Sequence, residues 1–129
     1  DQHDAGHVLC NDTGVITERD PDTIRGPDVW FIGYGKVPKG PLPSERYLDI
    51  VPEIAFEVKS PFDRWSDLLA KVTEYLHAGV SVVCVLDPQT ETARVFYPDL
   101  PFVVLSGDDE LIFPDQLPEF RVPVRRFFE

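Results

Sequence analysis

The chain has 129 residues, of which 43% are apolar and 12% aromatic, and this composition excludes an intrinsically disordered protein. Its 23 Asp and Glu residues outnumber 12 Lys and Arg residues. The resulting net charge of −11 argues against a protein that binds nucleic acid through a broad basic surface. The length predicts a single domain, residues 1–129, and no apolar run approaches the ~20 residues of a membrane span.

The start of the chain is polar and acidic (Asp-Gln-His-Asp), which is unlike a secretory signal, and no Met occurs anywhere. We therefore expect a fragment that lacks an N-terminal segment. Cys10 and Cys84 form no CxxC motif and no Cys/His cluster. This spacing argues against zinc, and the absence of a disulfide framework predicts a cytoplasmic location.

The first third of the chain predicts short strands followed by a loop. Residues 7–10 and 14–17 are apolar segments separated by Asn-Asp-Thr, a pattern typical of a small hairpin. Residues 27–33 predict a further strand, which opens with Pro27-Asp28. Residues 35–52 contain four prolines and two glycines, and we expect a mobile loop there.

The middle of the chain contains the clearest periodicity. Residues 53–59 predict a strand that is apolar except at Glu57 and Lys59. A single helical face is then formed by Trp65, Leu68, Leu69, Val72 and Leu76. Residues 60–63 fit a capping box with Pro at the first helical position, although Asp63 is an alternative cap, and Gly79 is placed to end the helix.

The remainder of the chain predicts more strands. Residues 80–86 are typical of a buried strand, 93–97 and 102–105 of antiparallel strands, and 110–112 of a short strand, whereas 117–128 predict an irregular aromatic tail. The strand–helix–strand unit in the centre predicts an α/β fold with a mixed sheet flanked by antiparallel strands.

Two charged residues interrupt the apolar strand 53–59. Because side chains alternate along a strand, Glu57 and Lys59 project from the same face, about 7 Å apart. A structural protein gains little from such a pair in an apolar strand, whereas an enzyme can use the carboxylate to hold a hard cation and the lysine to activate water. Asp28, at the start of the neighbouring predicted strand, is the second carboxylate that Mg²⁺ would need.

Pro27-Asp28 followed by Glu57-Val58-Lys59 resembles the PD-(D/E)XK motif of restriction-endonuclease-like proteins. The surrounding sequence is similar to the Uma-two family of endonucleases over residues 6 to 127. The similar positions include Lys71 before Tyr75, Ala-Gly-Val at 78–80, Leu-Asp-Pro at 86–88 and Leu-Pro-Glu-Phe-Arg-Val-Pro at 117–123.

This resemblance implies a restriction-endonuclease-like fold and hydrolysis of DNA phosphodiester bonds with Mg²⁺ or Mn²⁺. Asp28 and Glu57, with a backbone carbonyl near Val58, would bind the metal, and Lys59 would activate the attacking water. Many members of the family rely on a helix lysine matching Lys71, which would assist here; a solvated lysine covering apolar surface is the alternative. The family begins with helices that this chain lacks.

Two alternatives remain open from the sequence. The acidic charge and the missing helices favour a binding or regulatory module that keeps a nuclease fold with little or no catalysis. In a purely structural protein, by contrast, Asp28 and Glu57 would lie too far apart to share an ion. The sequence does not separate DNA from RNA as substrate. Related nucleases act as dimers in many cases, so a homodimer is also an expectation, although no segment marks an interface.

Overall fold

A computed structural model of the chain describes residues 6–10, 15–19, 22–25, 28–33 and 51–129. Six strands form one sheet in the order β1-β4-β5-β6-β7-β8. They are β1 (Gly6–Cys10), β4 (Val29–Gly33), β5 (Ile54–Val58), β6 (Val82–Asp87), β7 (Thr92–Phe96) and β8 (Val103–Ser106). β5 and β6 run parallel and the other neighbours antiparallel, so the predicted mixed sheet is confirmed.

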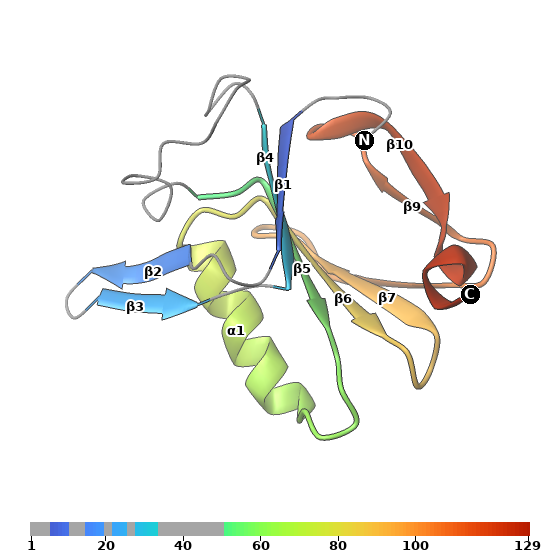
Figure 1. Cartoon of the computed structure of the whole chain (residues 1–129), viewed down its shortest axis with the longest axis horizontal. Helices are drawn as coiled ribbons and strands as arrows, with labels where there is room; N and C mark the ends of the chain where they lie inside the picture. The colour runs from blue at the N-terminus through green and yellow to red at the C-terminus, as the bar shows by residue number, and fades with distance from the viewer. Residues whose placement is uncertain (1–5, 11–14, 20–21, 26–27, 34–50) are drawn as a thin grey trace.

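Helix α1 (Trp65–His77) connects the parallel strands β5 and β6 and covers one face of the sheet (Figure 1). Its predicted apolar stripe is largely confirmed, because Leu68 and Val72 are buried against the sheet and Trp65 and Leu76 are partly buried beside them, whereas the buried Tyr75 lay outside the predicted stripe. Leu69 is 41% exposed, so it lies at the edge of the stripe. The strand–helix–strand unit therefore forms as the periodicity predicts.

The two ends of α1 differ in how well the sequence predicts them. Gly79 has φ +108°, and the Val80 and Gly79 N–H groups donate to the Tyr75 and Leu76 carbonyls, which is a Schellman ending. The predicted N-terminal cap is wrong, because the cap residue is Arg64 and has no side-chain hydrogen bond. The Asp63 carboxylate instead accepts the Ser60 N–H at 2.8 Å, which closes a separate turn before the helix.

The predicted hairpin at 7–17 is also wrong. β1 pairs antiparallel with β4, and β2 (Val15–Arg19) pairs with β3 (Asp22–Arg25) in a separate two-stranded ribbon. The apolar pattern identifies both segments as strands but carries no information about their partners, because pairing depends on the rest of the sheet. The loop predicted at 35–52 falls mostly in residues 34–50, outside the described part of the chain.

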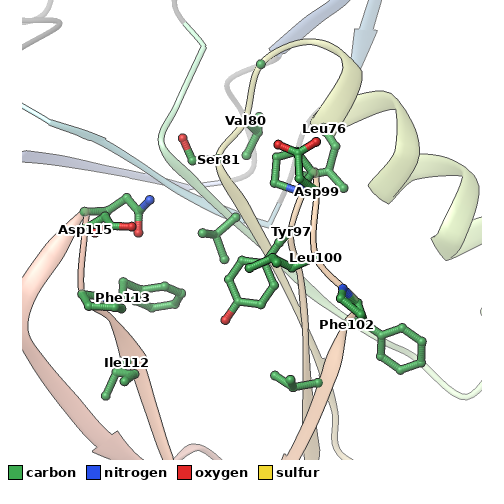
Figure 2. A pocket seen from close by; sticks show the side chains of 17 residues that line it. Leu76, Val80, Ser81, Tyr97, Asp99, Leu100, Phe102, Ile112, Phe113 and Asp115 are labelled. Atoms are coloured by element: carbon green, nitrogen blue, oxygen red, sulfur yellow. The ribbon is translucent and has the colours of Figure 1, made fainter.

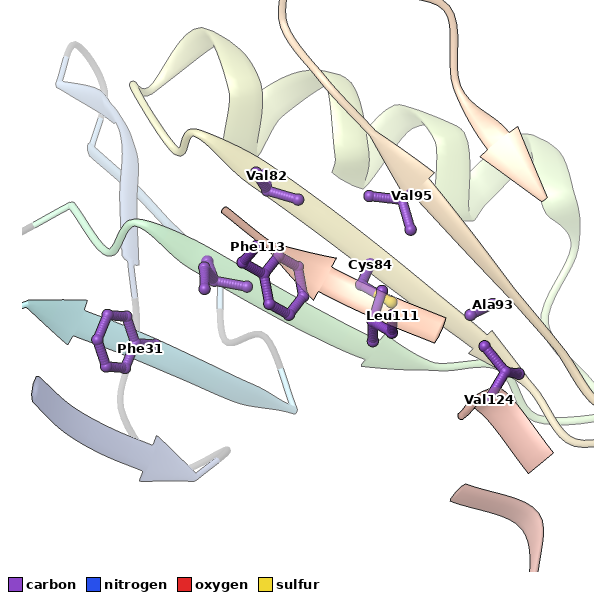
Figure 3. Close-up of a cluster of buried hydrophobic side chains, with 9 residues drawn as sticks. Phe31, Val82, Cys84, Ala93, Val95, Leu111, Phe113 and Val124 are labelled. Carbon is purple, nitrogen blue, oxygen red and sulfur yellow. The ribbon is translucent and has the colours of Figure 1, made fainter. Parts of the chain in front are cut away.

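The other face of the sheet is covered by β9 (Glu110–Phe113), β10 (Leu117–Pro123) and the 3₁₀ helix η2 (Val124–Phe128) (Figures 1 and 3). The expectation of an irregular tail is therefore wrong: β10 pairs with β9, with a register irregularity between Leu117 and Arg121. Pro118 and Pro123 obscure the alternation that would mark a strand. Val124 at the start of η2 is fully buried against the sheet.

The sheet thus separates two hydrophobic clusters. The cluster between the sheet and β9, β10 and η2 comprises Phe31, Ile54, Val82, Cys84, Ala93, Val95, Leu111, Phe113 and Val124 (Figure 3). The cluster under α1 comprises Ala55, Leu68, Val72, Tyr75, Val80, Val83, Val85 and Phe96. Within the described residues, no helix has the length and apolar character needed to cross a membrane.

Candidate active site

Two acidic residues meet where β4 and β5 lie side by side. The register pairs Val29 with Phe56 and Trp30 with Ala55, so Asp28 and Glu57 are the next residues along the two strands. The Val58 N–H donates to Asp28 Oδ2 at 2.7 Å, which holds the aspartate against the end of β5. The antiparallel pairing therefore brings together two carboxylates that are far apart in the sequence.

Glu57 is buried, with a side chain only 3% exposed, and it faces α1. Its Oε1 accepts a hydrogen bond from the Tyr75 hydroxyl at 3.0 Å. The Nζ of Lys71, one helical turn earlier, lies 3.5 Å from the same oxygen. Because residues four apart lie on one side of a helix, α1 presents a hydroxyl and an ammonium to a single oxygen of the carboxylate.

The pKa of Glu57 is raised above its ordinary value of 4.5, chiefly because burial disfavours the charged form. The positive charge of Lys71 and the hydrogen bond from Tyr75 act in the opposite direction, whereas the negative charge of Asp28 adds to the rise. A buried carboxylate whose pKa is raised by burial and by a neighbouring negative charge is an arrangement that a cation stabilises.

The oxygen donors fit a hard divalent cation. Asp28 and Glu57 supply carboxylates, and because the N–H and C=O of a strand residue point the same way, the Val58 carbonyl is directed to the side where Asp28 lies. No group of three His, Cys, Asp or Glu side chains gathers at one point in the described residues. Mg²⁺ commonly takes only one or two carboxylates and completes its shell with water and phosphate oxygens, so the pair suits Mg²⁺ better than zinc.

Lys59 directly follows β5, two residues after Glu57, and its ammonium contacts other groups. Its Nζ is 3.4 Å from the Ser60 carbonyl and 5.9 Å from the centre of the Trp65 ring. Among the described residues no carboxylate oxygen lies within 4 Å of it. The structure therefore joins Glu57 to Lys71, whereas Lys59 stands beside the pair without a salt bridge.

Two residues near the acid pair were missed as site residues in the sequence. Tyr75 contacts Glu57 directly; its signal is a tyrosine on the buried stripe of α1, where the hydroxyl needs a partner. Arg94 lies in β7, with its guanidinium carbon 4.1 Å from the centre of the Trp65 ring. Its signal is an arginine inside an otherwise apolar strand segment.

Two other features lie apart from the acid pair. Asp87 is buried, and its Oδ1 accepts the Gln89 N–H at 3.0 Å, as expected for a residue that ends a strand with a turn. A cavity of about 970 Å³ opens beside the start of β6, and Figure 2 shows the rings of Tyr97 and Phe113 pointing into it. None of the candidate site residues lines this cavity.

Comparisons with known proteins identify the fold and the family of the chain. The chain resembles the crystal structure of "a putative nuclease belonging to DUF820" from Anabaena variabilis ATCC 29413, with a TM-score of 0.82 and 17% sequence identity. The similarity covers 98% of this chain and 69% of that chain, and it shows a shared fold. A search of curated proteins returned no match. The family model described as "Uma2: Putative restriction endonuclease" matches residues 1–125, and the chain therefore belongs to the Uma2 family.

Proposed function

We propose that the protein is a divalent-metal-dependent endonuclease that hydrolyses phosphodiester bonds of DNA. The observation that carries the proposal is the pair Asp28 and Glu57, placed on adjacent strands with Lys71 and Tyr75 both directed at one oxygen of Glu57. Family membership supports a nuclease, and the residue chemistry supports the metal.

Each residue of the site has a distinct task in this proposal. Asp28 and Glu57 hold Mg²⁺ or Mn²⁺, with the Val58 carbonyl as a further ligand. When bound, the metal polarises the phosphate and lowers the pKa of water. Because Lys71 and Tyr75 occupy Oε1 of Glu57, the second oxygen is left for the metal, and both residues act as positioning residues.

Lys59 is the group best suited to meet the reacting atoms. Its ammonium forms no salt bridge with a carboxylate in the described structure, and the residue directly follows β5, the strand that carries Glu57. A cation in this position can orient the attacking water and stabilise the negative charge that develops on the phosphate oxygens. Lys71 assists indirectly, because its positive charge lowers the pKa of the buried Glu57 against the larger effect of burial and so favours the ionised form.

A cleavage assay tests the proposal. Supercoiled plasmid DNA is incubated with protein in Mg²⁺, in Mn²⁺ and in EDTA. We expect nicking that requires metal and that falls at least about a hundredfold in Asp28→Asn and Glu57→Gln, because each change removes a charged metal ligand. Glu91→Gln, an exposed site, is the matched control and should cleave normally. Full cleavage by the Asp28→Asn protein, or cleavage in EDTA, would contradict the proposal.

A catalytically silent nuclease-fold module is the second candidate. It is favoured by the absence of a third acidic side chain at the pair within the described residues and by the net charge of −11. Mn²⁺ titration followed by electron paramagnetic resonance separates the two candidates. A silent module predicts no Mn²⁺ binding that depends on Asp28 and Glu57, whereas the enzyme predicts such binding.

Sedimentation of the same samples tests the expected homodimer.

A further inference from the structure

The cations of residues 51–129 fall into two groups. The seven are Lys59, Arg64, Lys71, Arg94, Arg121, Arg125 and Arg126. Three are matched by carboxylates: Lys71 by Glu57, Arg121 by Glu110, and Arg125 by Asp108 and Glu129. Of the four that form no salt bridge in the described structure, Arg126 lies in η2, and the other three gather at the start of α1.

Trp65 is the centre of this second group. Its ring lies 4.1 Å from the guanidinium carbon of Arg94 and 5.9 Å from Lys59 Nζ, and Arg64 precedes it in the chain. The two ring distances place Lys59 and Arg94 at most about 10 Å apart. A carboxylate of the same loop, Asp63, accepts the Ser60 N–H, and its pKa is lowered mainly by this bond, with smaller effects of the positive charges of Lys71 and Lys59.

Arg94 is held in an unusual way. Its guanidinium lies over the ring of Trp65 and also over that of Phe102, 5.8 Å from the ring centre. The Nε atom is buried and has no hydrogen-bond partner. The terminal nitrogens are not buried in this way, so they reach solvent. The aromatic rings thus leave the outer edge of the guanidinium, with its N–H donors, available to a ligand.

The Nε–H of the Arg94 guanidinium has no acceptor among the described residues. A buried donor without an acceptor destabilises a fold, and in a native protein such a group calls for an explanation, such as a catalytic role or a bound ion or water. The chain contains 23 acidic residues, yet none of those described pairs with Arg94. The planar guanidinium edge matches a phosphate, which can accept two parallel hydrogen bonds.

We propose that Arg94, whose guanidinium contacts the rings of Trp65 and Phe102, binds a backbone phosphate of the nucleic acid adjacent to the phosphate that is cleaved. The identity of the ligand rests on the proposed nuclease function. Lys59, near the same Trp65 ring, serves the reacting phosphate, so one stretch of nucleic-acid backbone contacts both cations. This arrangement supplies local positive charge within a chain whose net charge is −11.

Binding of a labelled duplex, measured by fluorescence anisotropy over a series of salt concentrations, tests this inference. Ca²⁺ replaces Mg²⁺, and a gel checks that the duplex stays intact. We expect Arg94→Gln to weaken binding about tenfold and to reduce the slope of log K against log salt by about one, as for one lost phosphate contact. Arg94→Lys should keep the wild-type slope, because the positive charge stays. Its affinity should lie between those of Arg94→Gln and the wild type, because an ammonium cannot donate the two parallel hydrogen bonds of a guanidinium.

Arg126→Gln is the matched control, because it removes the same charge at an exposed position in η2. An equal loss in Arg126→Gln, or no loss in Arg94→Gln, would overturn the inference. If circular dichroism shows that Arg94→Gln does not fold, the Nε–Hε signal of Arg94 in the wild-type protein decides, assigned by its absence in Arg94→Lys. It should shift when the duplex is added, and an unchanged signal would refute phosphate binding.

The two proposals fail separately. If the wild-type protein cleaves plasmid DNA but duplex binding does not depend on Arg94, only the proposed phosphate contact of Arg94 is refuted. A protein that cleaves nothing, yet loses duplex affinity and salt dependence in Arg94→Gln, refutes only the nuclease.

Discussion

The two faces of the six-stranded sheet use alternate residues of the same strands and differ in chemistry. The cluster beneath β9, β10 and η2 is built from aliphatic and aromatic side chains and one thiol, with the rings of Phe56 and Phe113 edge to face at 5.7 Å. The face beneath α1 buries Glu57, Asp87 and the hydroxyl of Tyr75 among its aliphatic residues. One face therefore supplies stability, and the other tolerates the polar groups of a site.

The apolar face should be the most sensitive to truncation. Phe113→Ala removes a ring that is 1% exposed and that contacts both Phe56 and Phe120. We expect a loss of about 3–5 kcal/mol in the free energy of unfolding, measured with urea. Phe62→Ala is the control, because Phe62 is 94% exposed, and it should change stability by less than about 0.5 kcal/mol. Similar losses of unfolding free energy in Phe113→Ala and Phe62→Ala would contradict the stabilising role of the apolar face.

The polar face should show the opposite response. Glu57→Gln removes a buried charge while keeping an acceptor for the Tyr75 hydroxyl. Beyond its effect on cleavage, it should raise the free energy of unfolding at pH 7 by about 1 kcal/mol, because a buried ionised pair is often less favourable than a neutral replacement. A marked loss of stability in this variant would show that the ion pair with Lys71 stabilises the fold.

Tyr75→Phe should have a smaller effect on catalysis. It removes one hydrogen bond to Glu57 and keeps the ring, so we expect the cleavage rate to fall about tenfold, the effect of about 1.4 kcal/mol. Tyr97→Phe, which changes a half-buried tyrosine beside the cavity of Figure 2, is the control and should cleave at the wild-type rate. Equal rates for Tyr75→Phe and the wild type would remove Tyr75 from the site.

The raised pKa of Glu57 also predicts a pH dependence of stability. Between 4.5 and the higher value of the folded state, the native protein binds more protons than the unfolded chain, so this group makes stability fall as the pH rises. The increase in the free energy of unfolding caused by Glu57→Gln should therefore be largest at neutral pH and should shrink as the pH falls towards 4.5. Urea titrations of both proteins at several pH values measure this, and a constant difference would contradict the assignment.

The smallest expected effect is on the reactivity of the Cys84 thiol, which lies on the apolar face. Burial raises the pKa of its thiol to about 12, so almost no thiolate forms at neutral pH. In a Cys10→Ser background, we expect Ellman's reagent to leave Cys84 unmodified in the folded protein and to label it in urea. Rapid labelling of the native protein would mean that the apolar face opens readily.

Local patterns account for the features that the sequence predicts well. The stripe from Trp65 to Leu76 is repeated within one helix, and Gly79 ends that helix through its own positive φ, so both depend on neighbouring residues alone. The alternation around Glu57 depends on one strand. By contrast, the residues of β4 that pair with β1 lie at least 19 positions away in the sequence, and the two prolines of β10 obscure the alternation of that strand. Pairing and register depend on distant residues that no local pattern contains.

The candidate site divides in the same way. Asp28, Glu57 and Lys59 stand out in the sequence because charged groups in apolar strands are rare and because their spacing resembles a known motif. Only the tertiary structure decided which cation meets Glu57: α1 packs so that Lys71 and Tyr75 point at it, while Lys59 turns towards Trp65. Residue chemistry is local, but the direction of a long side chain depends on what the packed elements leave open.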